Sequence, residues 1–101
     1  MCIRDSYYLY EIAKTNFTEE RYKEAKDRIK KAIRLHDSDS RFYELSSRIE
    51  QKLERYDLAL KDVLIAYQLS NEVNDQNRFA DKAKLITPLV SQRQLQKLLR
   101  Q

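Results

Sequence analysis

The chain has 101 residues, enough for one domain, and it contains no glycine, one proline, one cysteine and one histidine. The absence of glycine disfavours the tight hairpins of most β-barrels and sandwiches and the phosphate-binding loops of P-loop and dinucleotide-binding domains. One cysteine excludes an internal disulfide, and one cysteine with one histidine argues against a zinc site. With 36% charged and 42% hydrophobic residues, the composition suits a helical protein with a large surface better than a disordered chain. We therefore expect an all-α protein, and no metal or cofactor.

The net charge of +4 is spread unevenly along the chain. Residues 1–70 hold 14 basic and 13 acidic side chains, and residues 71–101 hold 6 basic and 3 acidic ones. Proteins that bind nucleic acids usually concentrate positive charge more strongly, so no nucleic-acid partner is expected. No apolar run approaches the ~18 residues of a membrane span, and no signal peptide is recognisable. We therefore expect no membrane partner and a cytoplasmic location.

The first six residues, MCIRDS, resemble a translated sequencing adapter. On this interpretation residues 1–5 are a non-native or disordered N-terminus. The rest of the chain is then a fragment of a longer protein. The alternative is that these residues are a genuine start.

Local signals divide the rest of the chain into six predicted helices. Thr18, followed by Glu19 and Glu20, is typical of a helix start, because a hydroxyl cap and acidic side chains suit the positive end of the helix dipole. The polar segment 36–40 is a predicted turn, and Thr87-Pro88 predicts the end of one helix and the start of the next. The predicted helices span residues 6–17, 19–36, 40–53, 55–70, 75–86 and 88–100.

A sequence pattern occurs twice in the chain at a fixed offset. The segment Glu-Arg-Tyr-x-x-Ala at residues 20–25 returns at residues 54–59, and the apolar positions that follow stay in register. Their spacing keeps one face of a helix apolar, and the alanines allow two helices to approach closely. The matching positions are Tyr22 and Tyr56, Ala25 and Ala59, Ile29 and Val63, Ala32 and Ala66, and Leu35 and Leu69.

These paired segments resemble the tetratricopeptide repeat, a family with two helices in each 34-residue unit. The resemblance implies antiparallel helix pairs stacked as a short right-handed α-solenoid. It divides the chain into a first repeat at residues 6–39, a second at 40–73, and a degenerate third repeat or C-terminal capping helices at 74–101. In the second repeat, Ser46 and Ser47 stand where the family has a bulky and a small residue. The bulky residues of this helix come one position earlier than the usual phase, so the helix is expected to be rotated or its loop shortened. They are Phe42, Leu45, Ile49 and Leu53.

The resemblance also implies a function. The first helices of such units line a concave groove that binds a peptide, so a non-catalytic scaffold or adaptor is expected. Five of the eight residues that project onto the groove are basic, and an acidic peptide or a C-terminal carboxylate is therefore the expected ligand. The projected groove residues are Tyr7, Tyr10, Lys14, Arg41, Glu44, Arg48, Arg78 and Lys82.

The sequence contains no recognisable catalytic constellation. His36 stands at the predicted C-terminal end of a helix, where an imidazole donor is favourable, so its expected role is structural. No nucleophile, base and orienting group come together, and no enzymatic activity is expected. Two alternatives stay open: a helical-repeat module that binds RNA or another anionic polymer, and a regulatory segment of a larger enzyme.

Overall fold

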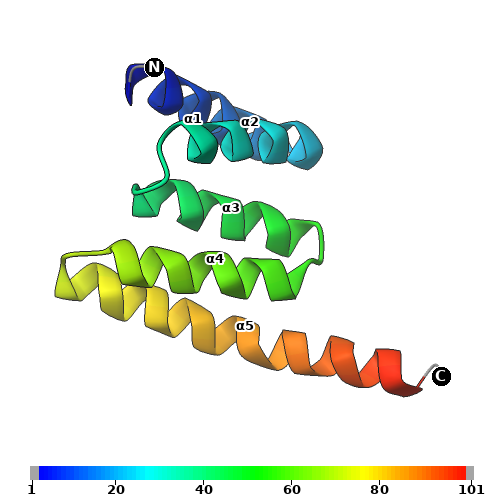
Figure 1. Ribbon diagram of the computed structural model, residues 1–101. Helices are drawn as coiled ribbons and strands as arrows, with labels where there is room; N and C mark the ends of the chain where they lie inside the picture. Colours follow the sequence, from blue (N-terminus) through cyan, green and yellow to red (C-terminus); the bar gives the residue numbers. More distant parts are fainter. Residues whose placement is uncertain (1–2, 100–101) are drawn as a thin grey trace.

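The computed structural model describes residues 3–99, with the side chains of residues 4–92. This part of the chain forms five α-helices joined by short turns and contains no strand. Successive helices pack against each other and run in alternating directions, from α1 at the top of Figure 1 to α5 at the bottom. The all-α prediction is confirmed. The helices are α1 (Ile3–Thr18), α2 (Tyr22–Leu35), α3 (Ser40–Lys52), α4 (Tyr56–Leu69) and α5 (Val73–Leu99).

The described residues form five helices where six were predicted. α5 is a single helix of 27 residues with Pro88 inside it, so the predicted helices 75–86 and 88–100 are continuous (Figure 1). Pro88 has no N–H group, and the carbonyl of Lys84 therefore lacks its usual helical donor. Pro88 is exposed, where water can solvate that carbonyl, and the hydroxyl of Thr87 donates to the Ala83 carbonyl at 2.7 Å. The proline is thus accommodated without a turn.

The N-terminal helix also starts earlier than predicted. α1 begins at Ile3 instead of residue 6, and Ser6 is fully buried. The helix therefore includes part of segment 1–5, whose non-native origin stays a prediction. Met1 and Cys2 lie outside the described residues.

The repeat period of the sequence recurs in the structure. α2 and α4 begin and end at equivalent positions of the two units. α1 and α3 also end at equivalent positions. The buried residues of α2 and α4 also correspond, and none of them is more than 1% exposed. They are Ala25, Ile29 and Ala32 in α2, and Ala59, Val63 and Ala66 in α4.

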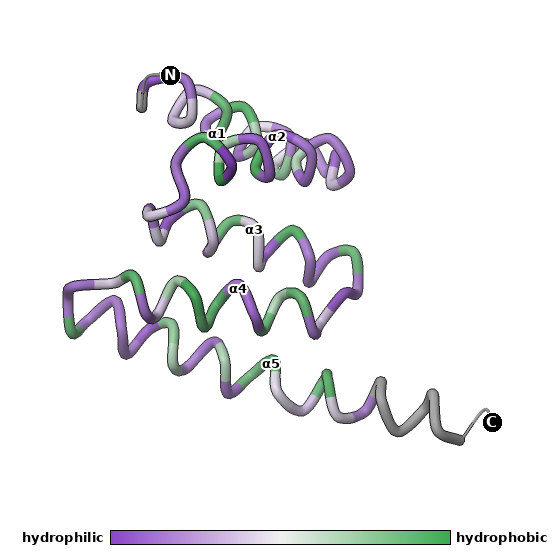
Figure 2. The backbone as a smooth tube through the Cα atoms, in the orientation of Figure 1, coloured by the Kyte–Doolittle hydropathy of each residue, from purple (hydrophilic) through white to green (hydrophobic). Residues whose placement is uncertain are grey.

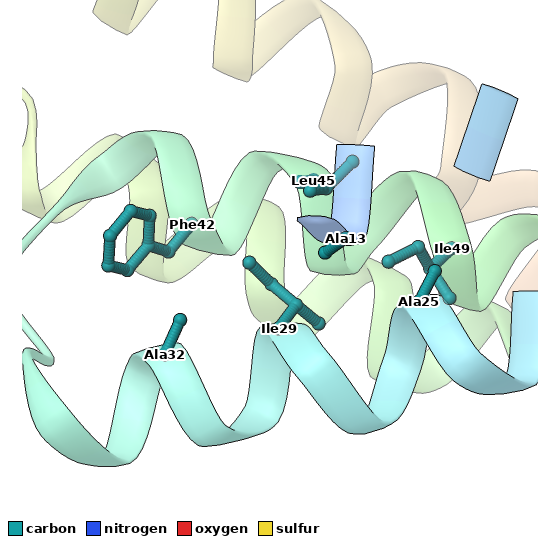
Figure 3. Packing of buried hydrophobic residues seen from close by; sticks show 7 residues of the cluster. All are labelled: Ala13, Ala25, Ile29, Ala32, Phe42, Leu45 and Ile49. Carbon is teal, nitrogen blue, oxygen red and sulfur yellow. The ribbon is translucent and has the colours of Figure 1, made fainter. Parts of the chain in front are cut away.

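Two hydrophobic clusters form the core. Hydrophobic and hydrophilic residues alternate along the helices as amphipathic packing requires (Figure 2). On α3, Phe42 belongs to the first cluster and its neighbour Tyr43 packs against the second, so α3 joins the two. The first cluster comprises Ala13, Ala25, Ile29, Ala32, Phe42, Leu45 and Ile49 (Figure 3), and the second Ala59, Val63, Ala66, Phe79 and Ile86.

The two serines of α3 are accommodated by hydrogen bonds to α4. Ser47 occupies the buried position that Ala13 holds one unit earlier, and its hydroxyl donates to the Ala59 carbonyl at 2.9 Å. The Ser46 hydroxyl donates to Asp62 Oδ2 at 2.7 Å. Both hydroxyls therefore have acceptors on α4, and the rotation of this helix stays a prediction.

The turns that end α1 and α3 adopt the same geometry. Glu20 has a φ of 63° and Glu54 a φ of 60°, the left-handed region that favours glycine. In the first turn the Glu20 amide donates to the Phe17 carbonyl and the Arg21 amide to the Asn16 carbonyl; the second turn repeats both bonds at the equivalent positions of the next unit. This is the Schellman arrangement of a helix end. The prediction that Thr18 starts the second helix is wrong, because Thr18 ends α1 and its hydroxyl donates to the Lys14 carbonyl.

Replacing Glu20 or Glu54 with glycine is expected to stabilise the protein. The left-handed conformation costs a residue with a side chain roughly 1–2 kcal/mol, and glycine avoids this cost. Glycine also has greater freedom in the unfolded chain, which offsets part of the benefit. We therefore expect the free energy of unfolding to rise by about 0.5 kcal/mol per site. Urea unfolding measures the change in the free energy of unfolding. Glu19→Gly is the matched control and should destabilise, because Glu19 does not have a positive φ. Loss of stability in Glu20→Gly would contradict this account of the turn.

Candidate functional site

The predicted groove residues lie on three helices, and the structure brings them together in two clusters and a cavity. The "aromatic cluster" contains Tyr7, Tyr10 and Lys14 of α1 with Arg41 of α3. The "ion-pair cluster" contains Glu44 of α3 with Arg78 and Lys82 of α5. Arg48 of α3 lines a cavity together with Glu44 and Lys82.

The aromatic cluster joins α1 to the start of α3. The ring centroids of Tyr7 and Tyr10 are 6.0 Å apart, and Tyr10 lies 5.0 Å from Phe42. The Arg41 guanidinium is 5.5 Å from the Tyr7 ring centre, and Lys14 Nζ is 5.3 Å from that of Tyr10, distances typical of cation–π contacts. Burial raises the pKa of the Tyr10 phenol above its ordinary value, although the Arg41 charge opposes this. Tyr10 therefore offers a neutral hydroxyl donor and an apolar ring at neutral pH.

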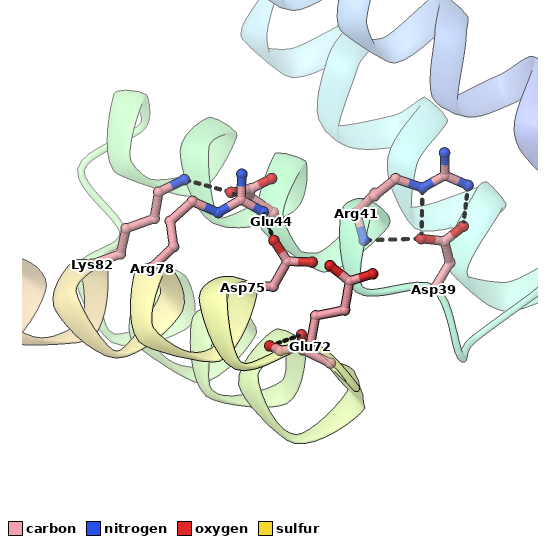
Figure 4. A network of polar contacts seen from close by, with 8 residues as sticks. Asp39, Arg41, Glu44, Glu72, Asp75, Arg78 and Lys82 are labelled. Carbon is pink, nitrogen blue, oxygen red and sulfur yellow. Dashed lines mark hydrogen bonds and ion pairs between the residues drawn. The ribbon is translucent and has the colours of Figure 1, made fainter.

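Asp39 holds Arg41 in this position. Its side chain caps α3 by accepting the Arg41 backbone N–H at 2.9 Å. The same carboxylate accepts hydrogen bonds from Arg41 Nε at 3.1 Å and Nη2 at 2.7 Å, which makes the pair bidentate (Figure 4). These hydrogen bonds lower the pKa of Asp39 and raise that of Arg41. One acidic side chain thus starts the helix and orients the guanidinium.

Replacing Asp39 with alanine is expected to lower the free energy of unfolding by about 1 kcal/mol at neutral pH, because the helix cap is lost. The pKa of Asp39 is lower in the folded protein, so its ionic contribution is complete above the ordinary value of about 3.9 and is lost as the pH falls through the folded-state value. Urea unfolding at neutral pH and at about pH 2 should therefore give a smaller penalty in acid. Asp37→Ala, which removes an exposed neighbouring carboxylate, should have little effect at either pH. Equal penalties for Asp39→Ala at both pH values would contradict the ionic contribution.

The ion-pair cluster connects α3 to α5 (Figure 4). Lys82 Nζ donates to Glu44 Oε2 at 2.6 Å, and Arg78 Nη2 lies 3.6 Å from the same oxygen. Arg78 also lies 3.5 Å from Asp75 Oδ1, and its guanidinium is 4.9 Å from the Phe79 ring centre. The Glu44 side chain is 14% exposed, so its pairing with two cations is partly shielded from water. Arg78 and Lys82 thus bind the two helices together.

A cavity of about 250 Å³ lies between α3 and α5. Arg48 is exposed beside it and has no ion-pair or hydrogen-bond partner within residues 4–92. Leu85 is 75% exposed, more than any other large hydrophobic side chain among the described residues. The cavity therefore combines an unpaired guanidinium with an accessible apolar surface. Its lining residues are Glu44, Ser47, Arg48, Gln51, Lys82, Leu85 and Ile86.

The ion pairs correct the charge argument made from the sequence. Lys14 lies 3.8 Å from a carboxylate oxygen of Glu11, and Arg41, Arg78 and Lys82 also have carboxylate partners. Among the five predicted cations, Arg48 alone lacks such a partner in the described side chains. A count of basic residues therefore overstates the positive charge available to a ligand.

Leu85 and Asp39 are site residues that sequence reasoning missed. Asp39 immediately precedes the predicted helix at residue 40, a position where a capping carboxylate could have been recognised. Leu85 follows the predicted groove residue Lys82 by three positions and so lies on the same helix face. Both residues fall within the predicted helix 75–86, but the exposure of Leu85 is known only from the structure.

Other site types receive no support from the described residues. Between residues 3 and 99 no group of three or more His, Cys, Asp or Glu side chains could hold a metal ion. No helix in this range is long and apolar enough to cross a bilayer. Comparison of the chain with protein-family models, curated proteins and solved structures finds no match. Function must therefore be inferred from the geometry of the chain itself.

Proposed function

We propose that the chain is a non-catalytic protein-interaction module of the tetratricopeptide-repeat type. The proposal is supported by helix bounds, buried alanines and left-handed turns that recur at equivalent positions of the two units. In this arrangement the helix pairs form a right-handed solenoid, and α1, α3 and α5 line its concave face. The module would scaffold or recruit a partner through a peptide segment.

The Arg48 cavity is the observation that carries this proposal. The Arg48 guanidinium, which has no partner among the described side chains, offers two parallel N–H donors to a carboxylate. Leu85 beside it offers apolar surface that folding leaves in contact with water. The ligand that suits both is a peptide in which a carboxylate stands next to an apolar side chain.

The aromatic cluster extends this surface along α3. Arg41 and Glu44 lie one turn apart on α3, and Glu44 is close enough to Tyr10 to influence the pKa of its phenol. Tyr7 is 44% exposed, so its ring remains accessible. An extended peptide anchored at Arg48 would reach the tyrosines, whose rings provide large contact area at low entropic cost.

The alternative of RNA binding is less favoured by the same contacts. Affinity for a phosphate backbone depends on cations that release counterions, and Arg41, Arg78 and Lys82 are already paired with carboxylates. Tighter, steeply salt-dependent binding to poly(U) than to peptide would support RNA binding instead. A regulatory role within a larger enzyme would use the same peptide-binding face.

Replacing Arg48 with glutamate is expected to weaken peptide binding by about tenfold or more, because a repulsive charge replaces the anchor. The probe is a fluorescein-labelled peptide that alternates glutamate and leucine, and fluorescence anisotropy gives the dissociation constant. Arg28→Glu makes the same charge change at an exposed position of α2 and should leave affinity nearly unchanged. A version of the peptide with glutamine for glutamate should bind wild type weakly. Equal affinity in Arg48→Glu and Arg28→Glu would contradict the site.

A further inference from the structure

A second cavity, of about 330 Å³, shares no lining residue with the Arg48 cavity. Its lining comes from α2, α3 and α4. α2 and α4 both pack against α3 but not against each other. The cavity lies between α2 and α4, beside α3. Ile33, Tyr43, Leu58 and Ile65 provide its apolar surface.

Glu50 is a buried carboxylate at this cavity that lacks hydrogen-bond donors. Its side chain is 2% exposed, and neither carboxylate oxygen has a hydrogen-bond partner in the described residues. Lys26 Nζ is 3.8 Å from Oε1, which is an ion pair but longer than a hydrogen bond. A buried charge without donors is costly, so a ligand that supplies them would be favoured.

Asp62 adds a second carboxyl group to the same cavity. Its Oδ2 accepts a hydrogen bond from Ser46 at 2.7 Å. Burial raises the pKa of Asp62 and the nearby charge of Glu50 adds to this effect, whereas the Ser46 hydrogen bond and the charges of Lys61 and Lys30 oppose it. Ionised carboxylates repel each other and can only accept hydrogen bonds. The two groups therefore suit a cationic ligand with several N–H donors.

The surrounding residues select among cations. Lys30, Arg34 and Lys61 also line the cavity, and their exposed charges weaken the binding of any cation and most of all that of a ligand with two positive charges. A divalent metal usually needs more oxygen ligands than two carboxyl groups provide, and the described residues contain no suitable group of three. The apolar walls instead suit a short hydrocarbon chain that carries one charge.

We propose that this cavity binds the ammonium group of a primary alkylamine, with Glu50 and Asp62 as acceptors and the alkyl chain against Ile33, Leu58 and Ile65. A free amine and a lysine side chain of a partner protein present the same chemistry. The site is independent of the peptide-binding face, because its residues lie on different surfaces of α3 and on other helices.

Titration of the protein with n-butylamine, followed by the methyl NMR signals of Ile33, Leu58 and Ile65, tests this proposal. Saturable shifts with a dissociation constant of about 1 mM are expected, and n-butanol, which lacks the charge, should bind about tenfold more weakly. Nα-acetyl-lysine N-methylamide tests the lysine side chain as the source. Tighter binding of this compound than of n-butylamine would assign the site to a partner's lysine, and the reverse to a free amine.

Glu50→Gln keeps the shape of the side chain and should weaken n-butylamine binding about tenfold. Glu24→Gln, an exposed change on α2, is the matched control and should bind like wild type. Absence of saturable shifts in the wild-type protein, or equal affinity for n-butanol, would overturn the proposal even if the Glu50 variant failed to fold. Such a result would mean that the cavity holds water alone, and it would not affect peptide binding at Arg48.

Discussion

Replacing Phe42 with alanine is expected to lower the free energy of unfolding by about 3–5 kcal/mol. Phe42 is 1% exposed and belongs to the cluster that joins α1, α2 and α3 (Figure 3). Its ring contacts Tyr10, with centroids 5.0 Å apart, and His36, with centroids 6.2 Å apart. His36 caps the C-terminal end of α2, so truncation of Phe42 removes contacts at the junction of both units. Urea or thermal unfolding followed by circular dichroism gives the loss directly.

Tyr8→Ala is the matched control for this change. Tyr8 holds the position equivalent to Phe42 in the preceding unit and is also aromatic, but it is 67% exposed. Its removal should change stability by no more than about 0.5 kcal/mol. Similar losses for the two variants would mean that Phe42 does not occupy the core described here.

Replacing Lys26 with methionine is expected to lower the free energy of unfolding by about 3 kcal/mol, because the buried Glu50 loses its nearest cation. The Lys26 side chain is 16% exposed, so this pair is shielded from solvent. Lys23→Met, at an exposed position in the same helix, should have a much smaller effect. Methionine retains most of the aliphatic volume of lysine, and the difference between the variants therefore reports the charge.

Glu50→Gln in the Lys26→Met background separates this charge effect from packing. Glutamine carries no charge, so the double variant should regain much of the stability lost in Lys26→Met. Unfolding free energies of the two single variants and the double variant complete the cycle. A double variant at least as unstable as Lys26→Met would show that charge is not the cause.

The sequence predicted the second helix of each unit well, because its regularly spaced alanines indicate which face of the helix is buried. Ala25 and Ala59 follow the same spacing, and both are fully buried. The helix ends were harder to predict. Thr18 satisfies the rule for a helix start, but its hydroxyl bonds back to the preceding turn and Glu20 adopts the positive φ that a glycine would normally supply. The absence of glycine therefore did not remove left-handed turns from this chain.

Pro88 shows a second limit of local rules. A proline after a threonine is typical of a helix boundary, yet α5 continues because Pro88 faces solvent and Thr87 bonds to Ala83. Packing on both sides of this point, by Ile86 and Val90 against the second cluster, favours one continuous helix. Tertiary contacts of this kind are not visible in the local sequence.

The predicted site residues of α3 contact those of α1 and of α5, but the sequence could not show which charges form ion pairs. Glu44 was included as a groove residue, and the structure makes it the acceptor for Arg78 and Lys82. Arg48 stays unpaired within the described side chains because no carboxylate of α3 or α5 reaches it there. This distinction depends on the spacing between helices, which sequence periodicity does not specify.

Titration of ¹⁵N-labelled protein with the unlabelled glutamate–leucine peptide shows which surface of the chain binds the peptide. Amide shift changes should concentrate around Arg48 and Leu85 and extend to Tyr10, while the amides of α2 change little. Shift changes confined to α2 and α4, or none with peptide at about 1 mM, would contradict the claim that α1, α3 and α5 form a peptide-binding face.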